Sequence, residues 1–302
     1  MHSYVWVIDT RDRRHYISRK FPAGGIMPIV AISRQMGSLG SEIAERVAAA
    51  LKVPLIHSQI QDAVAARWGM DLDLIRGFRY AVLPHVNPQA SLAMAKVSFI
   101  RHSLMEFATQ ECRAVFRGWG AAQFLPALPN VVRVFIGAPL SVRVKRVSAR
   151  HKVGETAAEN LIKEEDSMKA RLARDHARVD WTRFDGYELC INTGRTSVED
   201  AVSQVVGLAQ SRDGVPAGAA VELLQKASLE ALARATLLHN RTTRSCPVSI
   251  NATAKGLAVV GIVDNGEQRE AIISSLAAAI RSVPIHAQIR ARTDYRTRTS
   301  SI

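Results

Sequence analysis

The sequence predicts an α/β protein in which a parallel sheet, with helices on both faces, is followed by a smaller α+β unit. Short apolar segments alternate with amphipathic helical segments from residue 27 to about 210, which is typical of strands buried on both faces and covered by helices. The chain has 302 residues, of which 47% are hydrophobic. That length is enough for one sizeable core and a second, smaller one.

The elements of the first unit follow from apolar runs and the turn residues between them. The predicted strands are 28–33, 53–56, 112–117, 131–136 and 187–192, and the predicted helical segments are 41–51, 57–110, 140–175 and 197–210. Parallel strands place their carboxyl ends at one edge of the sheet, and ligands bind beyond that edge. We therefore expect a ligand site where the loops after residues 33, 117, 136 and 192 meet.

Changes in composition mark the limits of the other segments. Residues 1–26 combine a short apolar stretch with a basic run and are predicted to form an N-terminal arm. Residues 211–220 have the Gly, Pro, Ser and Ala content of a linker. These limits predict a first domain at 27–210 and a second at 221–292, followed by a basic tail at 293–302 that lacks apolar periodicity.

Charge and cysteine content restrict the class of protein. The formal net charge of +13 favours polyanionic partners such as nucleotides, nucleic acid or acidic lipid headgroups, although a solvated basic surface without a dedicated partner is the plain alternative. Cys112, Cys190 and Cys246 lack the paired spacing of a metal or redox site. No secretory signal and no apolar run of ~18 residues is present. The sequence therefore predicts a cytoplasmic protein with reduced thiols and no transmembrane segment.

The segment AISRQMGSLGSEIAERVAAAL, residues 31–51, runs from a strand through a glycine-bearing turn into a helix. Unpaired amides at the start of a helix bind phosphate oxygens, and glycines let the backbone approach them. Gly37 and Gly40 meet that need. The hydroxyls of Ser38 and Ser41 can add contacts. No GK[ST] occurs in the chain, so the strict Walker A pattern is missing, and an ordinary α/β corner is the alternative to a phosphate site.

Four segments, in chain order, resemble the cytidylate kinase-like family of P-loop proteins. The first, AISRQMGSLGSEIAERVAAALKVPLIHSQI, is similar to that family's opening Ile-Ser-Arg-Gln-x-Gly-Ser-Gly-Gly run, with Leu39 in place of a glycine. The others are LPNVVRVFIGAPLSVRVKRV (128–147), AAENLIKEEDSMKARL (157–172) and WTRFDGYELCINTGRTSVEDAV (181–202). The resemblance covers about 27–210 and implies a P-loop kinase-like fold that binds ATP, with Mg²⁺ if the protein is catalytic.

The resemblance also implies roles for the basic residues. In the related nucleoside monophosphate kinases, the loop holds the donor's phosphates and an arginine-rich lid closes over them. The phosphate-binding set implied here is Arg34, Gln35, Gly37, Ser38, Gly40, Ser41, Arg143, Arg146 and Arg195. Arg34, which can replace part of the missing lysine's charge, is also a catalytic candidate together with the lid residues Arg171 and Arg174, because phosphoryl transfer depends on neutralising charge.

Each of these basic residues has a plainer alternative. Lys163 and Lys169 lie on the same predicted lid, and long basic side chains on an exposed helix are most often solvated. The segment NTGRTS (192–197) is equally consistent with a strand-to-helix turn in which Thr196 or Ser197 caps the helix.

The chain departs from the related kinases at the acceptor site. In FRGWGAA, Trp119 stands where those kinases have an arginine that grips the acceptor's phosphate. Arg117 is predicted to point the same way and to compensate, so both residues are candidates for substrate binding. No carboxylate ends this strand to hold Mg²⁺, and Glu164 and Asp166 are expected to pair with neighbouring bases. We therefore assign no metal ligand.

The second domain is predicted to have the order helix, strand, strand, helix, strand. A helix at 221–238 and alternation through 250–290 give this order, which resembles a BON domain, a small bacterial module. That resemblance implies binding to anionic phospholipid or an envelope partner; a plain packing or dimerisation unit is the alternative. No nucleic-acid motif accompanies the basic residues, so nucleic acid is an unlikely partner. Those residues are Arg281, Arg290, Arg292, Arg296 and Arg298.

Two functions follow from these expectations. The first is an ATP-binding phosphotransferase that acts on a nucleoside monophosphate or another small acceptor. The second is a catalytically degenerate nucleotide sensor or adaptor that docks through the BON-like domain to membrane lipid or a protein partner. The missing lysine and acceptor arginine leave both open, because one charge clamp can be worth about 10³–10⁵ in rate. The sequence specifies neither the acceptor nor the oligomeric state.

Overall fold

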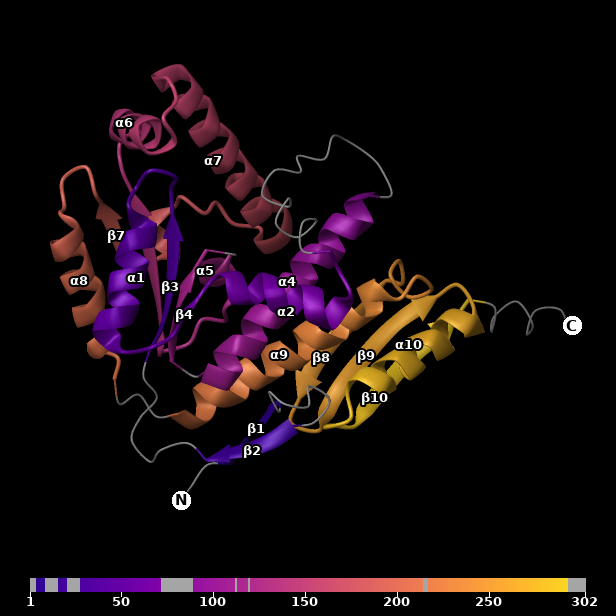
Figure 1. Ribbon diagram of the computed structural model, residues 1–302. Helices are drawn as coiled ribbons and strands as arrows, with labels where there is room; N and C mark the ends of the chain where they lie inside the picture. The colour runs from indigo at the N-terminus through magenta and orange to yellow at the C-terminus, as the bar shows by residue number, and fades with distance from the viewer. Residues whose placement is uncertain are drawn as a thin grey trace, which may run out of the picture.

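The computed structural model describes residues 4–8, 16–20, 28–71, 89–111, 113–118, 120–213 and 217–292. Its largest sheet is parallel and has the strand order β4-β5-β3-β6-β7, with β3 at the centre (Figure 1). The strands are β3 (Ile29–Arg34), β4 (Leu55–Ile56), β5 (Ala114–Arg117), β6 (Val131–Gly137) and β7 (Leu189–Asn192). The predicted parallel sheet is confirmed, and β5 begins at Ala114 instead of 112.

Helices cover both faces of this sheet. On one face, α1 (Gly40–Leu51) and α8 (Val198–Gln210) pack over Val30 and Ile32 of β3. The other face lies under α2 (Ser58–Trp68), α4 (Gln89–Glu111) and α5 (Ala121–Phe124), against Ile29 and Ala31. β3 is therefore buried on both sides, which is why its sequence is a continuous apolar run.

Two further helices stand above the carboxyl ends of the strands. α6 (Leu140–His151) and α7 (Glu155–Ala177) pack against one another, and Figure 1 shows both beyond the tip of β3. Val144, Val147, Ala158 and Ile162 make a small core of their own between them. α7 carries the residues that the sequence assigns to a lid, and α6 precedes it in the chain.

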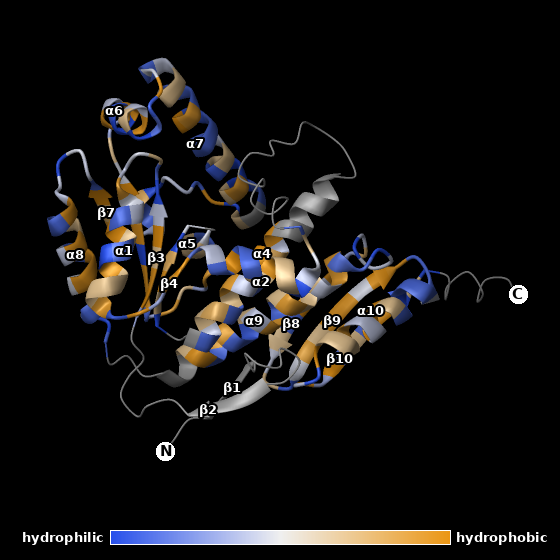
Figure 2. Ribbon diagram, viewed as in Figure 1, coloured by the Kyte–Doolittle hydropathy of each residue, from blue (hydrophilic) through white to orange (hydrophobic). Residues whose placement is uncertain are grey.

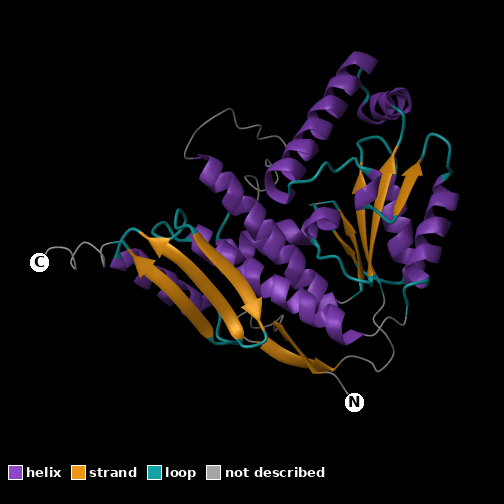
Figure 3. Ribbon diagram, turned by 180° about the vertical axis from the view of Figure 1, so that it is seen from behind, coloured by secondary structure: helices purple, strands orange, loops and turns teal. Residues whose placement is uncertain are grey.

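The C-terminal part has the predicted order of elements. These are α9 (Ala217–His239), β8 (Val248–Thr253), β9 (Gly256–Val263), α10 (Gly266–Ala279) and β10 (Ile285–Ala291). β9 pairs antiparallel with β8 and parallel with β10, and Figure 3 shows the resulting three-stranded sheet beside its helices. α9 begins inside the segment predicted as a linker. The likeness to a BON domain and its lipid partner stay predictions.

A single hydrophobic core joins the C-terminal part to one face of the parallel sheet. α9 packs along α4, and Figure 2 shows hydrophobic residues on the strands of both sheets that these helices separate. Trp68 of α2 stacks on Phe99 of α4 at 4.6 Å and lies 5.6 Å from the ring of His239 on α9. α4 and α9 are thus shared by the two domains that the sequence predicts.

The chain's outer segments are described only in part. In the predicted arm, β1 (Tyr4–Ile8) pairs antiparallel with β2 (Tyr16–Lys20). Cys190 and Cys246 are free thiols, whereas Cys112 and the predicted tail at 293–302 lie outside the described residues. Among the helices that the structure describes, none combines the length and apolarity needed to cross a bilayer.

The turn from β3 into α1 contains two residues with positive φ. Gly37 has φ 76°, and Leu39, the residue before α1, has φ 61° and ψ 7°. This left-handed conformation costs a residue with a Cβ roughly 1–2 kcal/mol, whereas glycine adopts it freely. At Gly37 a Cβ would also lie 2.9 Å from the carbonyl oxygen of Arg143. Leu39 therefore occupies a backbone position suited to glycine.

The continuous core predicts that the first domain needs α9. Leu224, Leu232 and Leu237 of α9 are buried in that core, and burial of each leucine stabilises the fold by about 1.5–3 kcal/mol. Their sum is comparable with a whole domain's stability of about 5–15 kcal/mol. We expect a chain ending at Asp213 to unfold at a much lower temperature than the full chain in calorimetry. An unchanged cooperative transition in the shortened chain would contradict the shared core.

The backbone strain at Leu39 predicts that a glycine at this position is more stable than an alanine, which reverses the usual order. At most positions alanine is more stable than glycine by about 0.5–1 kcal/mol. With φ fixed near 61° at this corner, we expect Leu39→Gly to be more stable than Leu39→Ala by about 1 kcal/mol. Both variants lose the same side-chain packing, so urea unfolding of the pair isolates the backbone effect. Greater stability of the alanine variant would show that the corner relaxes.

Candidate functional site

The turn from β3 into α1 is held in shape by its own side chains. Ser38 is fully buried, and its hydroxyl donates to the carbonyl oxygen of Gln35 at 2.8 Å. The Oε1 of Gln35 accepts from the backbone N–H of Ala138 at 3.2 Å. From the turn after β7, the Thr193 hydroxyl donates to the carbonyl oxygen of Ser38 at 2.9 Å. In this arrangement Gln35 and Ser38, both predicted phosphate ligands, brace the loop.

The amides that begin α1 are the donors that this corner offers to an anion. In the described part of the chain, the backbone N–H groups of Gly40, Ser41 and Glu42 donate to no oxygen atom. Such first-turn amides, together with the positive end of the helix dipole, bind anions. The backbone thus supplies the donors expected of a phosphate-binding loop although the loop has no lysine.

Two predicted phosphate ligands on α6 contact the backbone of the loop. The Arg146 guanidinium donates to the carbonyl oxygens of Gly37 at 3.3 Å and Thr193 at 2.8 Å. Arg143 is buried and donates from Nη1 to Asp166 Oδ2 on α7 at 2.7 Å, which ties α6 to α7. These contacts give both arginines a part in positioning the loop and the lid.

Lys169 is a site residue whose importance sequence reasoning missed. From α7, its Nζ donates to the carbonyl oxygen of Arg34 at 2.8 Å, forms an ion pair with Glu165 and lies 5.4 Å from the centre of the Trp181 ring. The Lys169 side chain is 18% exposed, against 63% for Lys163 on the same helix. Its position in line with buried Ala158, Ile162 and Ala173 is a periodic signal that the sequence contains.

The surroundings of Lys169 alter its ionisation. Burial lowers the pKa of Lys169 below its ordinary value, the negative charge of Glu165 opposes that change, and the positive charge of Arg34 adds to it. The ammonium is therefore a poorly solvated cation at the start of the loop. Such a cation interacts strongly with an incoming anion.

Two adjoining cavities open between the carboxyl ends of β3 and β5, α5 and α7. Their volumes are about 100 and 70 Å³, and both are lined by Arg34, Gly120, Phe124, Lys169 and Leu172. Val97 and Ile100 of α4 line the first cavity, and Trp181 lines the second. The cavities thus have cationic groups at the loop end and apolar walls beyond it.

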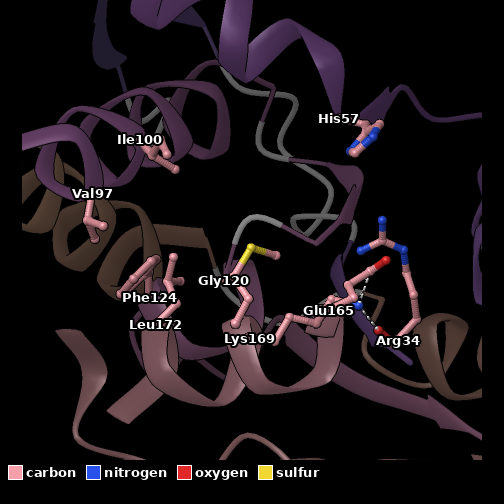
Figure 4. A pocket seen from close by; sticks show the side chains of 10 residues that line it. Arg34, His57, Val97, Ile100, Gly120, Phe124, Glu165, Lys169 and Leu172 are labelled. Atoms are coloured by element: carbon pink, nitrogen blue, oxygen red, sulfur yellow. Dashed lines mark hydrogen bonds and ion pairs between the residues drawn. The ribbon is translucent and has the colours of Figure 1, made fainter. Parts of the chain in front are cut away.

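His57 was not singled out from the sequence but belongs to the first cavity. Figure 4 shows its ring across from the Arg34 guanidinium, in the cavity that Glu165 also lines. His57 Nδ1 lies 3.0 Å from the carbonyl oxygen of Arg117. Because a carbonyl oxygen only accepts, Nδ1 carries the proton in this contact, which leaves Nε2 unprotonated in the neutral ring.

The other predicted cations lie outside these cavities. Arg171 and Arg174 of α7 are exposed, and so is Arg195 in the turn after β7. In that turn the Ser197 hydroxyl accepts from the Asp200 amide at 3.0 Å, so Ser197 caps α8, as the alternative interpretation expected. The catalytic roles of Arg171 and Arg174 and the phosphate-binding role of Arg195 stay predictions.

The acceptor-site candidates are only partly described. Arg117 lies on the α1 side of the sheet with Val115, and its Nη1 is 2.6 Å from Glu45 Oε1 on α1. The cavities lie on the opposite face, toward Phe124 and α4. Trp119 lies outside the described residues. The structure therefore does not bring Arg117 together with Arg34 and Lys169.

The described residues contain no group of three or more His, Cys, Asp and Glu side chains arranged to hold a metal ion. Near the loop, Asp166 pairs with Arg143 and Glu165 pairs with Lys169. These carboxylates are thus already engaged by cations, as the sequence led us to expect of Asp166.

A sequence profile of the Cytidylate kinase-like family matches residues 29–195. Cytidylate kinase from Pyrobaculum neutrophilum is 29% identical over 177 residues, which are 58% of this chain and 89% of that protein. Cytidylate kinase from Pyrobaculum calidifontis is 27% identical over 177 residues, with the same shares covered.

Solved structures resemble the chain less closely. An uncharacterized protein from Eubacterium ventriosum superposes with a TM-score of 0.48 at 23% identity, over 61% of this chain and 99% of that one. Shikimate kinase from Bacteroides thetaiotaomicron does so with a TM-score of 0.39 at 14% identity, over the same shares. The family profile spans the loop, both lid helices and the turn after β7, which is more than half of the chain. The chain therefore belongs to the cytidylate kinase-like family.

Proposed function

We propose that this protein binds ATP at the corner of β3 and α1 and transfers the terminal phosphoryl group to a small acceptor, with nucleoside monophosphates as the first class to test. Family membership supports nucleotide binding and phosphoryl transfer as the general activity. The local geometry supports the same activity despite the missing loop lysine. The acceptor's identity rests on the family alone.

The observation that carries this proposal is the position of the Lys169 ammonium. Its 2.8 Å hydrogen bond to the Arg34 carbonyl oxygen places a cation from the lid at the point where β3 enters the loop. A P-loop lysine is a point charge that neutralises the transferring phosphoryl group. Lys169 supplies such a charge from a different element, α7, and would thereby complete the donor site.

The residues present offer partners for the phosphates of ATP but no ligand set for Mg²⁺. The first-turn amides of α1 and the Ser41 hydroxyl would hold phosphate oxygens, with Lys169 close to them. No carboxylate cluster is available within the described chain, so Mg²⁺ would be held by the nucleotide's own phosphates and by water. When bound, the metal would neutralise phosphate charge; the chain's own contribution is to position the nucleotide and exclude water from it.

The arginines divide into two proposed groups. Arg143 and Arg146 would act through the loop, since their guanidinium groups already contact the backbone or the lid. Arg171, Arg174 and Arg195 are exposed and would reach the phosphates only after a movement of α7 or of the turn after β7. Lys169 is therefore expected to matter more to the reaction than either exposed lid arginine.

Removal of the Lys169 cation tests the proposed activity. We expect Lys169→Ala to lower kcat/KM for ATP consumption by about 10²–10³, because one preorganised donor at a developing charge contributes on that order. The assay measures ADP formation with Mg²⁺ against a panel of nucleoside monophosphates. Arg34→Ala is expected to abolish turnover.

Lys163→Ala is the matched control. Lys163 lies on the same helix, is exposed and pairs with Glu159, so its loss should leave ATP consumption unchanged. If wild-type protein binds ATP but turns over no acceptor in the panel, transfer to nucleoside monophosphates is wrong, and the result supports the alternative of a nucleotide sensor. Equal losses in the two lysine variants would show that Lys169 has no special role.

The lowered pKa of Lys169 predicts a pH dependence of ATP binding. The ammonium form binds phosphate, so affinity is complete below the lowered pKa and is lost as pH rises through it, at a lower pH than for an ordinary lysine. Arginine stays charged throughout this range. We therefore expect Lys169→Arg to remove the alkaline loss in titrations with a non-hydrolysable ATP analogue. Identical alkaline losses in both proteins would assign the pH effect to another group.

A further inference from the structure

The Arg34 side chain leaves the phosphate-binding loop and reaches the neighbouring strand. A Cβ added to Gly118, directly after β5, would overlap the Nη1 of Arg34 and lie 3.3 Å from its Cζ. Gly118 has φ 74°, so both its backbone and its missing side chain favour glycine. The guanidinium therefore occupies the space over the end of β5, where the related kinases keep their acceptor arginine one residue later.

The path of the Arg34 side chain is fixed at its other end as well. A Cβ on Gly40 would lie 2.6 Å from the Cβ of Arg34, so Arg34 packs closely on the first residue of α1. Its Nε lies 3.4 Å from the Ser41 hydroxyl. Gly40 at the loop and Gly118 at the end of β5 have no side chain, and this leaves space for the Arg34 side chain to extend from the loop to the end of β5.

The guanidinium faces the cavities and the Lys169 ammonium lies at their edge. Figure 4 shows the Arg34 guanidinium projecting toward His57, whereas Lys169 turns back to the Arg34 carbonyl oxygen. Arg34 and Lys169 give the cavities two positive charges against the one negative charge of Glu165. An anionic group is therefore favoured beside the guanidinium, and Val97, Ile100, Phe124 and Leu172 offer an apolar wall to the rest of the molecule.

We propose that Arg34 binds the phosphate of the acceptor, and that it replaces in space the arginine that position 119 lacks. Lys169 then takes the place of the loop lysine on the donor side. A residue of α7 thus supplies the cation that the loop lacks, and a residue at the start of the loop supplies the cation that the end of β5 lacks. The guanidinium fork matches phosphate bidentately, which an ammonium does not. This inference rests on the proposed phosphotransferase activity and specifies its acceptor as a phosphate monoester with an apolar or aromatic body.

Calorimetric titration of the full chain separates the two binding sites. The probes are CMP, UMP, AMP and inorganic phosphate for the acceptor side and a non-hydrolysable ATP analogue for the donor side. We expect Arg34→Lys, which keeps the charge but loses the fork, to weaken nucleoside monophosphate binding by about tenfold or more while ATP-analogue affinity stays within about twofold. Gly118→Ala, which fills the guanidinium's space, should give the same selective loss with Arg34 intact. Lys169→Met should do the reverse.

The matched control is Arg46→Gln, which removes an exposed arginine of α1 that pairs with Glu42 and Glu199. It should leave both affinities unchanged. The inference is overturned if Arg34→Lys and Gly118→Ala weaken the ATP analogue as much as the monophosphates, or if wild-type protein binds the ATP analogue but no monophosphate at millimolar concentration. Binding of inorganic phosphate without binding of any monophosphate also overturns it, because the apolar wall would then contact no part of a ligand. Failure to bind the ATP analogue instead contradicts the proposed function itself.

Discussion

The candidate site depends on a largely buried ammonium, that of Lys169, which joins α7 to the turn between β3 and α1. Transfer of a lysine from water to a low-dielectric interior is unfavourable, and the fold offsets that cost with three partners around Lys169. They are the Arg34 carbonyl oxygen, the Glu165 carboxylate and the face of Trp181. The first of these partners belongs to the loop itself, so the position of α7 and the shape of the loop are determined together.

Under the proposed function, this arrangement lets a loop without lysine bind phosphate. The amides at the start of α1 come from backbone geometry, which Gly37 and the braces from Gln35, Ser38 and Thr193 maintain. Only the point charge has to come from elsewhere. In the proposed site α7 supplies it, because Arg143 and Asp166 tie α7 to α6 and because Lys169 of α7 bonds to the carbonyl oxygen of Arg34 at the end of β3.

The architecture was readable from the sequence, whereas the contacts of the site were not. Runs such as those of β3 and β6 are apolar because parallel strands are buried on both faces, and this pattern located them to within a residue or two. The sequence places Lys169 among several lid cations without distinguishing it, because its burial depends on how α7 packs on Arg34 and Trp181. The path of the Arg34 side chain depends likewise on Gly40 and Gly118, which are far apart in the chain. Helical periodicity also gave α4 and α9 their apolar faces without showing that the two faces meet.

The central claim is that the corner of β3 and α1 seats a triphosphate with the help of Lys169. A crystal structure of the full chain with Mg²⁺ and a non-hydrolysable ATP analogue tests it most directly. The account predicts phosphate oxygens within hydrogen-bonding distance of the Gly40, Ser41 and Glu42 amides and of Lys169 Nζ. Density for the nucleotide elsewhere, with Lys169 still bound only to Arg34 and Glu165, would contradict it.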